Sequence, residues 1–141
     1  MRFLAVLFFV LLANEAFSDE CLSRFTKYDV CAAARKMQEE IAPSLPLAIN
    51  SNMVFESALA IGPRFTMLVR WNAKTAKMNE LLAASNMTKD DLTKKIQAQT
   101  RAMVCGQQAI AAFVRLGGSV QYSYKTLDGE PVATVVIDKC V

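Results

Sequence analysis

The side chains that most often carry enzyme chemistry are scarce in this sequence of 141 residues. It contains no histidine, so the Ser-His and Cys-His pairs that activate a nucleophile cannot form. Two pairs of adjacent acids, Glu39-Glu40 and Asp90-Asp91, remain as candidates, because two carboxylates can share general acid and general base roles. Both pairs are expected on exposed helix turns, where solvation explains them, and Asp90-Asp91 also suits a helix N-terminus. We therefore expect a protein that is not an enzyme and that needs no cofactor.

The four cysteines indicate two disulfides formed in an oxidising compartment. Zinc binding is the competing interpretation, but there is no Cys-x-x-Cys motif and no histidine, so no metal site is expected. In one unbroken helix Cys21 and Cys31 would lie ~15 Å apart, whereas a disulfide needs Cα atoms within about 7 Å. Either the chain breaks near residues 27–29 and the two cysteines form a local bridge, which we favour, or they are not partners. A bond between Cys105 and Cys140 would attach a long helix to the last strand.

Residues 1–18 have the features of a secretory signal peptide. A basic residue at the start is followed by an apolar run over residues 3–13, and Ala16-Phe17-Ser18 offers small residues at a cleavage site. The apolar run is too short to span a bilayer, which needs roughly 20 residues. Two acids directly before Cys21 also fit poorly with lipid attachment. We therefore expect residues 19–141 to be a single soluble domain that is exported, without stable membrane insertion.

The N-terminal part of this domain is expected to be helical. Residues 19–42 contain many good helix formers, and Asp19 or Ser23 could cap the helix. Two prolines, at positions 43 and 46, then end the helical region. An extended passage is expected to follow over residues 44–52.

A β-hairpin is predicted next, from residue 53 to residue 71. Residues 53–61 and 64–71 both alternate between apolar and polar side chains, and Gly62-Pro63 punctuates the turn between them. The apolar row of the second strand is expected to face the core. That row consists of Phe65, Met67, Val69 and Trp71.

Two helices are predicted between this hairpin and the next. Residues 73–84 favour a short helix, and a long amphipathic helix is expected from Thr88 to about Leu116. Thr88 and Asp91 form an approximate capping box, and Gly117 is the expected left-handed residue after the helix. The apolar stripe of the long helix consists of Leu92, Ile96, Met103, Val104 or Cys105, Ile110 and Val114.

The second hairpin is centred on Asp128-Gly129, a favoured pair for a two-residue turn. Such a turn places Leu127 opposite Glu130, and counting back pairs Tyr122 with Val135. The resulting apolar face consists of Val120, Tyr122, Tyr124, Ala133, Val135 and Ile137.

The order of elements predicts an α+β domain, in which helices pack on one face of an antiparallel sheet of about four strands and disulfides staple the two layers. Because the apolar faces are assigned to the core, a binding surface is expected on the opposite face and at the sheet edges, where a partner strand can add. The candidate partner-binding residues are Arg64, Arg70, Gln121, Ser123, Lys125 and Thr134.

The C-terminal half resembles a pattern found in small exported bacterial proteins, including the beta-type pilotins of type II secretion. The motifs are Val104-Cys105, residues 117–124, Asp128-Gly129 and Val135-Val136-Ile137 before Cys140. The resemblance covers most of the mature chain and rests on structural motifs. It implies that the cysteines at positions 105 and 140 are bonded. The sequence departs from pilotins in lacking the lipid-attachment motif with which a pilotin travels with its secretin to the outer membrane.

We therefore expect a periplasmic protein that binds another protein. The main hypothesis is an immunity-type inhibitor of a delivered toxin, and the alternative is a pilotin-like adaptor that binds a secretion component. The formal net charge is +3, and the basic residues form no run. Nucleic acid is therefore not an expected partner.

Overall fold

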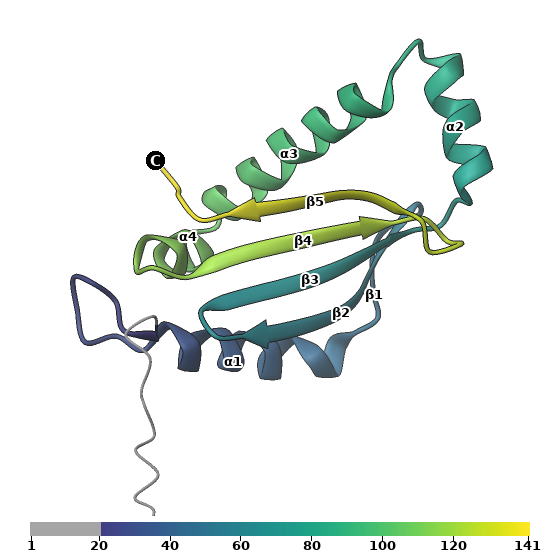
Figure 1. Cartoon of the computed structure of the whole chain (residues 1–141). Helices are drawn as coiled ribbons and strands as arrows, with labels where there is room; N and C mark the ends of the chain where they lie inside the picture. Colours follow the sequence, from purple (N-terminus) through teal and green to yellow (C-terminus); the bar gives the residue numbers. More distant parts are fainter. Residues whose placement is uncertain (1–20) are drawn as a thin grey trace, which may run out of the picture.

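The structure, a computed structural model, describes residues 21–141, so the predicted signal peptide over residues 1–18 lies outside it. The described residues form four α-helices, one 3-10 helix and a five-stranded mixed sheet (Figure 1). The elements are α1 Val30–Ile41, η2 Ala42–Ser44, β1 Leu47–Asn50, β2 Met53–Ile61, β3 Arg64–Trp71, α2 Thr75–Ala84, α3 Lys89–Gly106, α4 Gln108–Arg115, β4 Ser119–Lys125 and β5 Pro131–Ile137.

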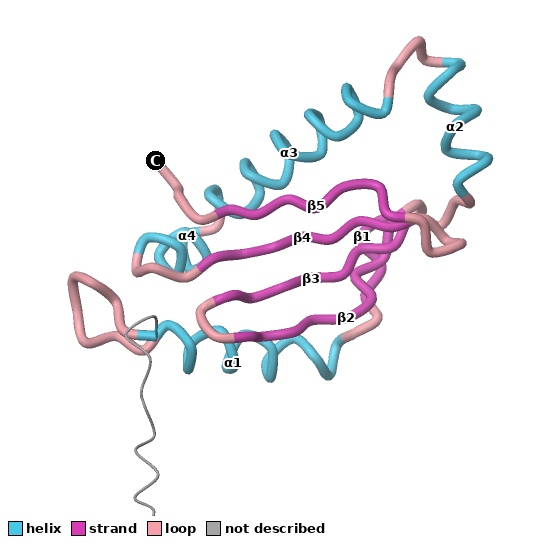
Figure 2. The backbone as a smooth tube through the Cα atoms, viewed as in Figure 1, coloured by secondary structure: helices cyan, strands magenta, loops and turns pink. Residues whose placement is uncertain are grey.

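The strands follow the order β1-β2-β3-β4-β5 across the sheet (Figure 2). β3 and β4 are parallel, with Phe65 opposite Val120, and the other neighbouring pairs are antiparallel. The α+β class is confirmed, but the predicted antiparallel sheet of about four strands is not. Parallel neighbours need a long crossover, which residues 72–118 supply with α2, α3 and α4. β1 has four residues, all exposed, so it lacks the alternation that identifies a strand.

α1 begins later than predicted. Its first residue is Val30, and Asp29 caps it by accepting a hydrogen bond from the backbone nitrogen of Ala32 at 2.9 Å. The two predicted caps are therefore not used: Ser23 is buried in the preceding loop, and Asp19 lies outside the described residues.

The predicted break before α1 and the local disulfide are confirmed. Residues 27–29 are not helical, and an isolated bridge between Leu22 and Asp29 closes the loop. The Cα atoms of Cys21 and Cys31 lie 5.1 Å apart in the disulfide. An unbroken helix would have separated the two cysteines too widely for this bond.

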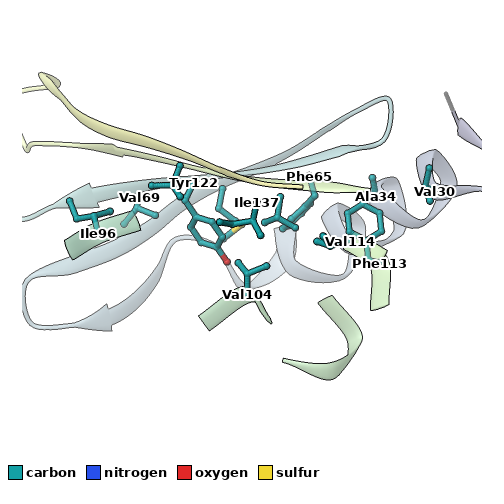
Figure 3. Close-up of a cluster of buried hydrophobic side chains, with 13 residues drawn as sticks. Val30, Ala34, Phe65, Val69, Ile96, Val104, Phe113, Val114, Tyr122 and Ile137 are labelled. Atoms are coloured by element: carbon teal, nitrogen blue, oxygen red, sulfur yellow. The ribbon is translucent and has the colours of Figure 1, made fainter. Parts of the chain in front are cut away.

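One hydrophobic core joins the helices to a single face of the sheet. The predicted apolar faces of β3, β4 and β5 point into it, and α1, α3 and α4 cover them (Figure 3). The buried core cluster consists of Val30, Ala34, Phe65, Met67, Val69, Ile96, Val104, Phe113, Val114, Val120, Tyr122, Val135 and Ile137.

Two contacts fasten α3 to the sheet. The hydroxyl groups of Thr100 and Tyr124 are hydrogen-bonded at 2.7 Å in a half-buried position, and burial raises the pKa of Tyr124. The predicted disulfide between Cys105 and Cys140 is present, with Cα atoms 5.4 Å apart. α3 is therefore joined to β4 and to the segment that follows β5.

The predicted long helix is divided into α3 and α4. α3 ends at Gly106, and Gln107 has the extended dihedrals φ −91° and ψ 112°. A helix loses stability at an interior glycine, by ~1 kcal/mol relative to alanine. The break at Gln107 changes the direction of the helical chain and lets α4 bury Ala111, Phe113 and Val114 against the same core. This packing offsets the loss of helical hydrogen bonds at the break.

The two glycines after α4 have separate roles. Gly117 has φ +108°, which confirms the predicted left-handed position after the helix. Gly118 lies against the ring of Phe113, where an added Cβ would come within 2.3 Å of the ring carbon Cζ. The pair thus ends the helix and lets the chain pass close beneath an aromatic side chain.

The last hairpin keeps its predicted register but not its predicted turn. The backbone nitrogen of Thr126 donates to the carbonyl of Glu130 at 2.9 Å. The loop between them therefore has three residues, 127–129, with Gly129 at φ +86°. Glu130 is therefore not opposite Leu127. A register shift beside Tyr124 compensates for the longer loop and restores the predicted pairs.

The turn between β4 and β5 also caps α2. The carboxylate of Asp128 accepts hydrogen bonds from the backbone nitrogen of Thr75 at 3.0 Å and from its hydroxyl at 2.9 Å. The N-cap residue of α2 itself makes no side-chain cap. Hydrogen bonds from Thr126 and then from Thr75 lower the pKa of Asp128 to about 2.

This cap should make stability depend on pH. Because the pKa of Asp128 falls from 3.8 to about 2 on folding, its contribution is present above the unfolded pKa and is lost as pH falls through the folded pKa. We expect wild type to be more stable than Asp128→Ala at neutral pH, with the difference closing between about pH 4 and pH 2. Urea denaturation across this range measures it. A difference that does not change with pH would contradict the prediction.

The two disulfides should contribute unequally. They link residues 10 and 35 positions apart, and the longer loop restricts the unfolded chain more. Loop-closure entropy gives about 4 kcal/mol for Cys105–Cys140 and about 3 kcal/mol for Cys21–Cys31. Urea denaturation of the two double-alanine variants compares them directly. A larger loss for the Cys21→Ala/Cys31→Ala variant would show that the entropic account is wrong here.

Candidate functional site

The six residues predicted to bind a partner lie on three neighbouring strands. They come from β3, β4 and β5 and alternate with the buried residues of those strands, so they point away from the core. Several of them contact one another: Arg64 donates to Ser119 at 3.3 Å and to Gln121 at 3.4 Å, and Gln121 donates to Ser123 at 3.1 Å. The structure thus brings them together, and their role in binding stays a prediction.

Glu56 is the centre of this polar face, and sequence reasoning missed it. Its carboxylate lies 2.6 Å from Lys125 Nζ and 3.2 Å from Arg70 Nε, although this Nε has no well-aligned hydrogen bond. The β2 register shifts beside Glu56, so the bulged residue belongs to no regular alternation. The charges of Glu56, Arg70 and Lys125 are therefore largely paired with one another.

Removing the Glu56 carboxylate should lower the free energy of unfolding only slightly, and the size of this loss should depend on salt. The three side chains are 25–36% exposed, so we expect Glu56→Gln to lower the free energy of unfolding by about 0.5–1 kcal/mol at low salt. The loss should shrink in 1 M salt because screening weakens such pairs. Glu80→Gln is the control, since Glu80 pairs with Lys77 at a more exposed site. Equal losses in both variants would contradict this interpretation.

The adjacent acids occupy exposed positions, as predicted. Asp91 completes a capping box: it accepts from the backbone nitrogen of Thr88 at 3.0 Å, and Thr88 accepts from the backbone nitrogen of Asp91 at 3.1 Å. The Thr88 hydroxyl also donates to the Asp91 carboxylate at 2.7 Å, and this bond, followed by the one from the Thr88 backbone nitrogen, lowers the pKa of Asp91. Glu40 lies 3.8 Å from Lys36 in an exposed pair. The carboxylates thus serve helix structure and solvation.

A cluster of possible metal ligands lies beside α1, but its side chains already form a disulfide and a helix cap. Cys21, Asp29 and Cys31 have their ligand atoms within 4.8 Å of one another. Both sulfurs form the disulfide, and the Asp29 carboxylate caps α1. The group therefore offers a metal ion no thiolate ligand.

An apolar groove lies on the helix side of the sheet, where sequence reasoning did not place a site. It has a volume of about 400 Å³, with a floor from β2, β3 and β4 and walls from α1 on one side and from α3 and α4 on the other. Its lining residues are Met37, Glu40, Ile41, Ser44, Leu47, Phe55, Phe65, Met67, Met103, Gln107, Ile110 and Tyr122.

The lining of this apolar groove suits contact with apolar side chains. Three of the residues are methionines, whose flexible thioethers adapt to partners of different shape. The rings of Phe55 and Tyr122 lie 6.1 Å apart on the floor. Burial raises the pKa of Tyr122 to about 12, so its hydroxyl stays neutral at physiological pH. The groove offers apolar contacts and few polar groups, and its lining includes no acid–base pair.

Sequence reasoning missed this groove because its residues also belong to the predicted core stripes. Met103 and Ile110 belong to the apolar stripe predicted for the long helix, and both are half-buried in the structure. The break at Gln107 brings α3 and α4 side chains to one wall. The methionines at positions 37 and 103 do not distinguish a groove from a core, because methionine is common at adaptable binding surfaces and also fills cores.

None of the described helices is both long and apolar enough to cross a membrane. The two disulfides fit an oxidising compartment.

The fold is similar to that of two type II secretion pilotins and of one secreted bacterial protein, as the sequence resemblance predicted. The structure is similar to the pilotin EpsS of the Vibrio vulnificus type 2 secretion system, with a TM-score of 0.60 and 8% identity over 77% of this chain and 86% of the other. The structure is also similar to the Vibrio cholerae pilotin AspS, with a TM-score of 0.59 and 16% identity over 78% of this chain and 89% of the other.

A Pseudomonas aeruginosa protein described as secreted is similar to the same degree, with a TM-score of 0.60 and 19% identity over 77% of this chain and 88% of the other. At such identities the likeness concerns the fold alone. No family model matches the sequence, and no curated protein matches it.

Proposed function

We propose that this protein is a pilotin-like adaptor of the periplasm, which binds an apolar segment of a secretion component in the groove between α1 and the α3–α4 wall. The observation that carries the proposal is the apolar groove itself, with its aromatic floor and one methionine in each helical wall. The shared fold of two pilotins supports it. None of the three structural neighbours is described as an immunity protein, so the inhibitor hypothesis has no comparable support.

An amphipathic helix is the occupant that the groove fits best. Its two walls are helices and its floor is a sheet, so an added helix would complete the helical layer and bury its own apolar stripe. Residues at i, i+3, i+4 and i+7 of such a helix would contact the methionines, while Gln107, at the break between α3 and α4, could make a polar contact.

A charge placed in the wall should weaken binding. Met103 is half-buried and lines the groove, so Met103→Glu would set an unpaired carboxylate against an apolar partner. We expect the affinity for the partner to fall at least tenfold, which is in the range for a central interface residue. Ala102→Glu, on the exposed side of the same helix, is the matched control and should bind as wild type.

Photo-crosslinking in the periplasm identifies the partner. A crosslinking residue at Met103 should capture a secretion component, identified by mass spectrometry, whereas one at the exposed Arg35 of α1 should not. Capture of a toxin from Met103 would overturn the adaptor proposal in favour of the inhibitor. Equal capture from both positions would show that the groove is not the site.

A further inference from the structure

The outer edge of β5 forms a second groove, separate from the apolar one. β5 is the last strand in the sheet order and pairs only with β4 among the described residues. α3 runs along the same side (Figure 1). The space between them has a volume of about 520 Å³ and is lined by Thr134–Ile137 together with Lys94, Gln97, Ala98 and Arg101.

Four consecutive β5 residues line this edge groove, so the backbone of the strand is accessible there. Thr134 and Val136 are exposed, while Val135 and Ile137 point into the core. In an antiparallel pair, every second residue of the edge strand directs its N–H and C=O away from the neighbouring strand. Pro131 has no N–H group, so the start of β5 is the poorer template, whereas residues 134–137 of its second half line the groove.

The helical wall of the edge groove is positively charged. Its four residues recur at i, i+3, i+4 and i+7 of α3 and therefore share one helix face. Lys94 and Arg101 stand at the two ends, and the small side chain of Ala98 leaves room between them. Arg101 also donates to the carbonyl of Lys139 at 2.8 Å, which holds the chain after β5 against α3. No acid is among the lining residues.

We propose that the β5 edge groove binds an extended acidic segment of a partner protein, which adds to the sheet as a sixth strand. Its backbone would pair with residues 134–137, and its acidic side chains would face Lys94 and Arg101. Charge complementarity selects this partner over a second copy of the chain, because two such edges would bring their cations together. The site shares no lining residue with the apolar groove, so the two can be tested separately.

Amide hydrogen exchange tests the proposal with a defined probe. The probe is an eight-residue peptide that alternates glutamate and valine, and its counterpart alternates lysine and valine. We expect the acidic peptide to slow exchange at alternate amides within residues 134–137 at least tenfold, and the basic peptide to have no such effect. Arg35→Glu, a charge reversal at an α1 residue that lines neither groove, should give the same result as wild type.

Two variants, with one control, test the charge and the shape of the edge groove separately. Lys94→Glu should weaken binding of the acidic peptide about fivefold or more, whereas Lys95→Glu, which does not line the groove, should change it less than twofold. Ala98→Trp fills the groove without changing its charge and should abolish protection. Folding of each variant is checked from its near-ultraviolet circular dichroism.

Three results would overturn the proposal. The first is equal protection by the acidic and basic peptides, and the second is no protection at millimolar peptide. The third is a concentration-dependent dimer, detected by analytical ultracentrifugation, in which the same amides are already protected without peptide. That result would assign the edge to a second copy of this chain.

Discussion

The parallel pairing of β3 with β4 is the constraint on which the rest of the structure depends. Two neighbouring strands that run in the same direction cannot be joined by a tight turn, so α2, α3 and α4 all lie in the connection between them. The connection returns over the face that α1 already partly covers. α1 and the α3–α4 pair thus occupy opposite sides of one sheet face, and the apolar groove is the space that they leave over its centre.

Those parts of the fold that depend on local chemistry could be predicted from the sequence. The alternation of apolar residues gave the buried faces of β3, β4 and β5, and the capping box and Gly117 marked helix ends. The direction of β4 relative to β3 could not be predicted, because it is set by contacts between residues about 55 positions apart. The division of the long helix at Gln107 likewise depends on what α4 packs against.

The candidate sites show the same division between local and distant causes. The polar residues on the outer face could be found from the alternation of the strands. The structure shows that Arg70 and Lys125 pair with Glu56, which lies at a β-bulge and therefore breaks the alternation. The apolar groove could not be predicted, since a methionine at a helical spacing looks the same in a core and in a groove. Only the placement of α1 relative to α3 distinguishes the two.

Asp128 caps α2 from a position 53 residues further along the chain than Thr75. The cap of α2 therefore cannot form until residue 128 is present. A chain that emerges N-terminus first, as it does during synthesis, exposes residues 75–84 well before residue 128. A helix of 10 residues is marginal in water without tertiary contacts. The same late segment carries β4, the partner of β3. The cap of α2 and the partner of the central strand β3 therefore both come from the segment after residue 118, and neither can form before that segment is present.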